Sequence, residues 1–178
     1  MPNYRRDHTK GGTYFITAVL QDRRCDWLTR HIAAFRTAWR ETAARYPYKT
    51  IAITILPEHF HAVLQLPEDD DNYPKRISAL KSAFSRSLPA HYRNPNPSQQ
   101  RKEEAGIWQR RFWEHRIRDE HDLQRHVFYT YYNPVKHGYV RRVIDWPYTS
   151  FHRDVQHGLF PPDWGGDLEP AISNLYPE

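Results

Sequence analysis

The chain has 178 residues, enough for one domain with a hydrophobic core, and its 26 Lys and Arg residues exceed its 21 Asp and Glu residues. The resulting net charge of +5 favours a polyanionic partner, although many proteins of this charge bind no nucleic acid. A single cysteine excludes an intramolecular disulfide and a CxxC metal site, and it is compatible with a reducing compartment.

The first residues contain no apolar signal region, and no apolar run approaches the ~20 residues that span a bilayer. We therefore expect a cytoplasmic protein that has no membrane partner.

The spacing of apolar residues predicts strands and helices in a definite order. After a basic arm over 1–12, residues 13–20 have the β-branched and aromatic composition of a strand. Further along the chain we predict a helix over 27–45, strands over 48–56 and 59–66, a helix over 73–88, a strand over 107–118 and a helix over 120–132 that ends before Pro134. Residues 89–106 are polar and rich in Pro and Asn, which predicts a mobile loop, and residues 145–178 predict an irregular tail.

The order of these elements, β-α-β-β-α-β-α, indicates the fold class. We predict an α+β fold over a single domain, 1–178. It consists of a ferredoxin-like antiparallel sheet, helices on one face of that sheet, and an added C-terminal helix followed by the tail. Because one fold can carry many functions, the site is inferred separately.

Two histidines stand two residues apart in the strand HFHAVLQL. Side chains alternate along a strand, so the apolar residues Phe60, Ala62 and Leu64 should face the core, and His59 and His61 should point the other way. Two imidazoles at this spacing can share one cation. The alternative is that they are two unrelated surface histidines.

The helix predicted over 120–132 carries a tyrosine one turn before an asparagine. Tyr129 and Asn133 are four residues apart and lie on one face of a helix, where a hydroxyl and an amide oxygen could both face the two histidines. Asn133 precedes Pro134, so we expect its side chain to bend freely toward a metal at the helix end. The alternatives are that Tyr129, Tyr131 and Tyr132 form a packing cluster, and that Asn133 is an ordinary helix-end residue.

Five segments in collinear order, from about residue 4 to 167, resemble one family. LPEHFHAVLQLPE resembles the HUH motif of single-strand nucleases, and RHVFYTYYNPVKHG resembles the tyrosine helix of the REP-associated tyrosine transposases. The opening YRRxxxxGGTYFIT, the block WQRRFWEHRIRD and the segment WPYTSFHRDVQHGL with the following PPDWGGD resemble the same family. The spacer 89–106 and Phe128 beside the tyrosine depart from its pattern.

This resemblance implies the HUH nuclease fold and a metal-dependent enzyme, with Mg²⁺ or Mn²⁺, that cuts and rejoins single-stranded DNA. It implies that Tyr129 is the nucleophile, which forms a 5′-phosphotyrosine, and that His59, His61 and Asn133 hold the metal. A general base for the phenol is not identified, although Lys136 and His126 are near in sequence.

The resemblance also implies the substrate, which is the palindromic hairpin of bacterial REP elements with a single-stranded foot. Guanidinium groups and aromatic rings suit the open faces of unpaired bases. We expect these residues to contact DNA: Arg5, Arg6, Lys10, Arg110, Arg111, Trp113, Arg116 and Lys136.

We further expect a bacterial, nucleoid-associated protein that is a monomer, with a dimer as the alternative. Two other functions stay open, namely a protein that binds REP hairpins without cutting them and a metallohydrolase that activates water.

Overall fold

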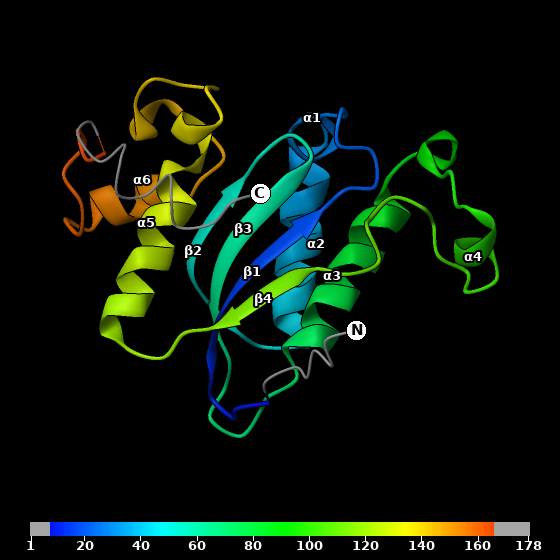
Figure 1. The fold of residues 1–178 in the computed structure, drawn as a ribbon, viewed down its shortest axis with the longest axis horizontal. Coiled ribbons are helices and arrows are strands. Elements are labelled where there is room, and N and C mark those ends of the chain that lie inside the picture. The colour runs from blue at the N-terminus through cyan, green and yellow to red at the C-terminus, as the bar shows by residue number, and fades with distance from the viewer. Residues whose placement is uncertain (1–7, 166–178) are drawn as a thin grey trace, which may run out of the picture.

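A four-stranded antiparallel sheet forms the centre of the protein, in the order β2-β3-β1-β4 (Figure 1). The computed structural model describes residues 8–165, so the expected DNA contacts Arg5 and Arg6 and the last part of the tail lie outside the described residues. The strands are β1 (Thr13–Val19), β2 (Lys49–Ile55), β3 (His59–Gln65) and β4 (Trp113–Arg116). This arrangement confirms the predicted α+β fold with an antiparallel sheet.

Two long helices, α2 (Ile32–Arg45) and α3 (Tyr73–Ser87), lie side by side against one face of the sheet (Figure 1). The alternating residues Phe60, Ala62 and Leu64 of β3 are buried on this face, as their spacing predicts. This packing forms the main hydrophobic core.

The helix α5 (Glu120–Lys136) covers the opposite face of the sheet, where it contacts β2 and β3. Its first turn is capped by Asp119, whose carboxylate accepts a hydrogen bond from the backbone N–H of Asp122. Side chains of α5 pack on Phe15, Ala52 and Val63 in a second buried cluster. The face that carries the two histidines is therefore buried as well.

The prediction that α5 ends at residue 132 is wrong, because the helix continues through Pro134 to Lys136. A proline inside a helix removes one backbone hydrogen bond and strains the preceding turn. Here Asn133 and Pro134 are both buried, and the backbone N–H of His137 donates to the carbonyl of Asn133, so packing and later hydrogen bonds maintain the helix.

The predicted helix over 27–45 is interrupted at His31, which separates α1 (Trp27–Arg30) from α2. The His31 ring contacts Tyr92, with 3.2 Å between the imidazole Nε2 and the tyrosine hydroxyl. Tyr92 belongs to the short helix η1 (Ala90–Tyr92), far away in sequence. A local pattern contains no information about such a partner.

The predicted strand over 107–118 is also too long, since only Trp113–Arg116 form β4. Trp108 makes an isolated bridge to Leu20. Between the two paired parts, the carbonyls of Gln109 and Arg110 accept hydrogen bonds from the ammonium group of Lys81, at 2.8 and 3.5 Å. These carbonyls therefore bind a side chain and not the backbone of a neighbouring strand.

Two segments that were expected to be irregular contain short helices. Residues 89–106 include η1 and α4 (Pro97–Gln100), and the described part of the tail predicted over 145–178 includes α6 (Phe151–Gln156), with η2 (Val143–Asp145) at its start. The helix α6 has too few residues for a clear periodicity, and it is held by tertiary contacts with α5. No helix among residues 8–165 has the length and apolar character needed to cross a bilayer.

One of these contacts joins Tyr131 of α5 to α6. The buried Tyr131 hydroxyl donates a hydrogen bond of 2.5 Å to the carboxylate of Asp154, and it lies 3.1 Å from the hydroxyl of Ser150. Asp154 is itself buried, so its carboxylate depends on this partner and on Arg153.

We expect Tyr131→Phe to lower the free energy of unfolding by about 1–3 kcal/mol, because it removes one partner of a buried polar group. Urea denaturation measures the difference. The matched control is Tyr139→Phe, which removes the hydroxyl of an exposed tyrosine and should change stability little. Equal stability of the two variants would contradict the structural role of Tyr131.

Candidate active site

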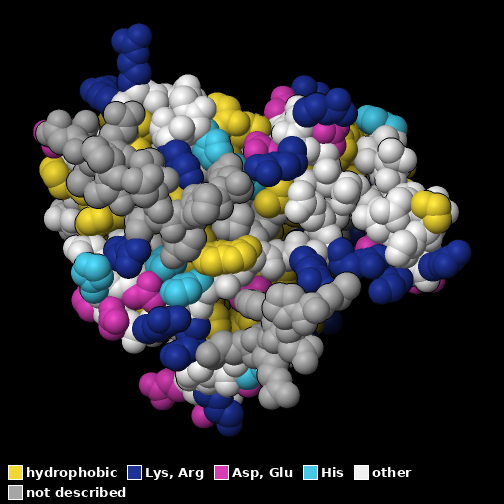
Figure 2. Space-filling view, in the orientation of Figure 1, with side chains coloured by type: hydrophobic (Ala, Val, Ile, Leu, Met, Phe, Trp, Pro, Cys, Tyr) yellow, Lys and Arg dark blue, Asp and Glu magenta, His cyan; other side chains and the backbone are white. Residues whose placement is uncertain are grey.

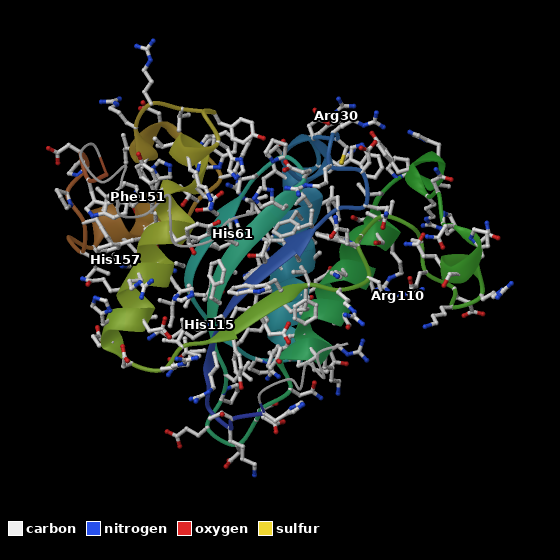
Figure 3. The ribbon with its side chains drawn as sticks, in the orientation of Figure 1. Arg30, His61, Arg110, His115, Phe151 and His157 are labelled. Carbon is white, nitrogen blue, oxygen red and sulfur yellow. The ribbon has the colours of Figure 1, made fainter. Side chains whose placement is uncertain are left out.

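The two histidines belong to β3, an inner strand of the sheet, and lie on the face that α5 covers; Figure 3 labels His61. His59 and His61 are each only 2% exposed. Their Nε2 atoms face each other at 3.2 Å, and their ring centroids are 4.8 Å apart. Because a metal–imidazole bond is about 2.1 Å long, this separation suits two nitrogens that bind one cation.

The second ring nitrogen of each histidine has its own partner. Nδ1 of His59 lies 2.9 Å from the carboxylate of Glu58, and Nδ1 of His61 lies 2.8 Å from the hydroxyl of Thr17. Partners of this kind hold the rings in orientation and leave the Nε2 lone pairs for a metal.

The charge state of the pair suits metal binding. Burial, together with the nearby charges of His59 and His137, lowers the pKa of His61 well below its ordinary value, so this ring is neutral at pH 7. Burial by itself would raise the pKa of Glu58, but the hydrogen bond and charge of His59 outweigh it and lower that pKa. A neutral imidazole, such as that of His61, is the state that binds a divalent cation.

The helix α5 brings three side chains of one face to this pair: Tyr129, Asn133 and Lys136. The Tyr129 ring is 5.2 Å from the His61 ring, with both measured at their centroids. The ammonium nitrogen of Lys136 is 3.4 Å from the Tyr129 hydroxyl and 5.0 Å from the centre of its ring. A positive charge at this distance can stabilise negative charge that develops on the tyrosine oxygen during a reaction.

Asn133 is fully buried and lies close enough to His61 to influence the pKa of that ring, but neither its amide oxygen nor its amide nitrogen has a partner in good hydrogen-bond geometry among the described residues. An amide without a partner inside a protein is costly unless a bound group satisfies it. It lies inside the helix, not at a frayed end as the sequence suggested. Two imidazole nitrogens and one such amide oxygen form a donor set that Mn²⁺ or Mg²⁺ accepts, so the residues present fit a divalent cation.

The neighbouring tyrosines have other surroundings. Burial and the hydrogen bond to Asp154 raise the pKa of Tyr131, which keeps this phenol protonated and directed toward α6. Tyr132 is buried in the cluster that joins α5 to the sheet.

The sequence did not single out three residues of this site: Thr17, Glu58 and His137. The ring of His137 lies 5.3 Å from that of His59. Glu58 directly precedes the histidine strand, so its contact with His59 could have been predicted from the sequence. Thr17 lies opposite His61 only because β1 pairs with β3 in this register.

A second group of potential metal ligands links β4 to α5. The group consists of His115, Asp122 and His126. One ligand atom of each residue lies within 4.8 Å of the ligand atoms of the other two. The Asp122 carboxylate is 2.8 Å from Nε2 of His115 and 3.1 Å from Nδ1 of His126. This group is separate from the His59 and His61 pair.

The residues expected to contact DNA are spread over the surface. Arg110 lies far from His61 in Figure 3 and forms an ion pair of 3.1 Å with Glu104. Lys and Arg side chains gather beside α4 in Figure 2, where these residues are exposed: Arg101, Lys102, Arg110 and Arg111.

Lys10 and Arg116 are not brought to the histidines. Lys10 lies before the start of β1, at the end of the strand away from Val19, the residue that pairs with His59. Arg116 pairs with Tyr14, whose ring belongs to the core on the α3 side of the sheet. By strand alternation, the Arg116 side chain leaves the sheet on that side. Trp113 leaves it on the α5 side.

An antiparallel sheet with two histidines on a central strand, and a tyrosine on the helix that covers them, is consistent with the HUH nuclease fold. No model of a protein family matches the chain. A Haemophilus influenzae protein described as a REP-associated tyrosine transposase is 59% identical over 172 residues, which are 97% of this chain and 98% of that protein. The REP-associated tyrosine transposase of Escherichia coli is 42% identical over 168 residues, 94% of this chain and 93% of that protein.

A solved structure, described as a REP-associated tyrosine transposase bound to a REP hairpin, matches with a TM-score of 0.81 and 42% identity, covering 94% of this chain and 93% of that one. The chain therefore belongs to the family of REP-associated tyrosine transposases.

The contact between Thr17 and His61 generates a prediction about metal affinity. Thr17→Val keeps the shape of the side chain but removes the partner of Nδ1, so Mn²⁺ should bind about 10- to 100-fold more weakly. Isothermal titration calorimetry measures this change. The control Thr13→Val, on the same strand and the same face, should bind Mn²⁺ as the wild type does. An unchanged affinity in Thr17→Val would show that the hydroxyl does not orient the ligand.

Proposed function

We propose that this protein binds REP-type palindromic DNA hairpins and cuts one strand at their single-stranded foot through a covalent bond to Tyr129. The observation that carries the proposal is the position of Tyr129. Its ring lies against His61, the Lys136 ammonium is at its hydroxyl, and the unsatisfied Asn133 amide is one helical turn away. A relative of 42% identity was solved bound to a REP hairpin, which supports the choice of substrate.

In the proposed reaction, the Tyr129 oxygen attacks the phosphorus in line with the departing 3′-oxygen. The bond from phosphorus to the tyrosine oxygen forms as the bond to the 3′-oxygen breaks, and the phenol loses its proton while the released oxygen gains one. Lys136 stabilises the negative charge of the attacking phenolate. The products are a 3′-hydroxyl end and a 5′-phosphotyrosine.

His59, His61 and Asn133 would hold Mg²⁺ or Mn²⁺. Such a cation withdraws charge from a phosphate oxygen and orients the scissile bond. Glu58 and Thr17 keep the two imidazoles in the orientation that this requires. The packing of α5 on the sheet limits the access of bulk water to the reacting groups.

Because the phosphotyrosine keeps the energy of the phosphodiester bond, the 3′-hydroxyl of another strand can attack it in the reverse sense. Strand transfer is then as accessible as cleavage. All side chains of the site come from one chain, so a monomer suffices for the chemistry.

The nucleophile is tested by Tyr129→Phe, which removes only the attacking oxygen. We expect cleavage to fall by more than about 10⁴-fold, as for other covalent nucleophiles, with hairpin binding retained. The assay is the denaturing gel mobility of the protein after incubation with labelled hairpin and Mn²⁺, followed by mass mapping of the modified peptide. Tyr132→Phe serves as the control and should still form the adduct.

An adduct that persists in Tyr129→Phe, or that maps to Tyr131 or Tyr132, would falsify the assignment of the nucleophile. Hairpin binding by the wild type without cleavage would indicate a binding protein. Cleavage without any adduct would indicate a hydrolase that activates water.

The metal ligands are tested by the double variant His59→Ala, His61→Ala. It should lose cleavage and keep most of its affinity for hairpin DNA, since phosphate contacts supply most of that affinity. In the wild type, a chelator should stop cleavage and added Mg²⁺ or Mn²⁺ should restore it. His157→Ala, an exposed histidine at the end of α6, is the control (Figure 3). Undiminished cutting by the double variant would overturn the metal assignment.

A further inference from the structure

Trp113 presents a large apolar surface to solvent at the first residue of β4. Its side chain is 44% exposed. Among the described residues, the other large apolar side chains with comparable exposure are Tyr139 and Leu159. A tryptophan is rarely left so open without a use in binding.

The strand pairing places Trp113 in the same row as the metal-ligand histidine. Trp113 lies opposite Thr17 of β1, and Thr17 lies opposite His61 of β3. Two strand spacings, about 10 Å, therefore separate the backbone positions of Trp113 and His61. The neighbouring residue Glu114 points to the opposite face, where it accepts a hydrogen bond of 3.1 Å from the Tyr73 hydroxyl, so Trp113 must project to the face of the site.

One aromatic ring connects Trp113 with the reacting groups. The Phe15 ring meets the Trp113 indole edge-on at 5.6 Å between centroids. The same phenyl ring is stacked on His61 at 5.5 Å and meets Tyr129 edge-on at 5.8 Å. The exposed indole thus contacts Phe15, the same ring that contacts His61 and the proposed nucleophile Tyr129.

Trp113 is held in place from behind. The indole is parallel to the His115 ring, with 6.1 Å between centroids and 6° between planes, and His115 is parallel to His126 at 4.5 Å and 12°. Asp122 joins the two imidazoles through its carboxylate oxygens, at 2.8 and 3.1 Å. An indole supported in this way loses little side-chain freedom when a ligand binds, which favours affinity.

We propose that Trp113 is a stacking platform for one unpaired base of the hairpin foot, next to the phosphate that is cut. The inference rests on the proposed function and adds the residue that positions the single strand. Stacking accepts any base because every base has a π-face, so Trp113 should order the foot without reading its sequence.

The test uses the full chain with Tyr129→Phe, so that binding is measured without cleavage. The probe is a REP hairpin in which 2-aminopurine replaces one nucleotide of the single-stranded foot at a time. Stacking on the indole should quench the fluorescence at one foot position. Trp113→Ala should abolish this quenching and weaken binding of the hairpin by about ten- to a hundred-fold.

The conservative variant and a modified substrate separate stacking from a structural effect. Trp113→Phe should retain most of the affinity, Trp113→Leu should not, and Leu159→Ala should have no effect. A hairpin with an abasic site at the quenched position should bind equally to protein with Trp113 and with Trp113→Ala. Equal weakening of the intact and the abasic hairpin would overturn the proposal, as would the absence of quenching at every position.

The outcomes also distinguish this inference from the proposed function. If Trp113 quenches the probe but the protein with native Tyr129 never cuts the hairpin, the stacking platform is supported and the proposed nuclease activity is rejected. Normal cleavage by a Trp113→Ala protein with native tyrosine, at wild-type hairpin affinity, would reject the platform and support the nuclease.

Discussion

The antiparallel pairing of β1 with β3 determines where the groups of the site lie. It places Thr17 opposite His61 and Val19 opposite His59, and through β4 it places Trp113 in the same row. A shift of one residue in this register would exchange the two faces of β3 and turn the histidines into the apolar core. The main core prevents such a shift, because Phe60, Ala62 and Leu64 fill the opposite face of the same strand.

The second constraint is the cost of covering a polar face. The helix α5 buries two imidazoles, a carboxylate and an amide on the sheet, and buried polar groups destabilise a protein unless they have partners. Glu58 and Thr17 satisfy the outer ring nitrogens. Within the described residues, neither polar atom of the Asn133 amide has a partner in good hydrogen-bond geometry, and this amide lies near His61. A bound ligand that satisfies this amide should therefore raise the stability of the folded protein.

Aromatic side chains connect the buried cluster under α5 with the solvent-exposed surface near the site. Phe15 belongs to the buried cluster under α5, yet it contacts His61, Tyr129 and the exposed Trp113. The column of Trp113, His115 and His126 rises from β4 to α5 and is held by Asp122. Rigid rings of this kind preserve the geometry of the site while one indole stays open to solvent.

Elements whose signal is local could be predicted from the amino-acid sequence. Alternation in HFHAVLQL put both histidines on one face of a strand, and the four-residue spacing of Tyr129 and Asn133 put these side chains on one face of a helix, because both periods are properties of the backbone. Tertiary structure decided the rest. The break at His31, the short β4 and the continuation of α5 past Pro134 depend on Tyr92, on Lys81 and on burial of the helix, and none of these causes is adjacent in sequence. Likewise, Thr17 becomes a partner of His61, and Trp113 a neighbour of the site, only through strand pairing, which joins residues that no local pattern relates.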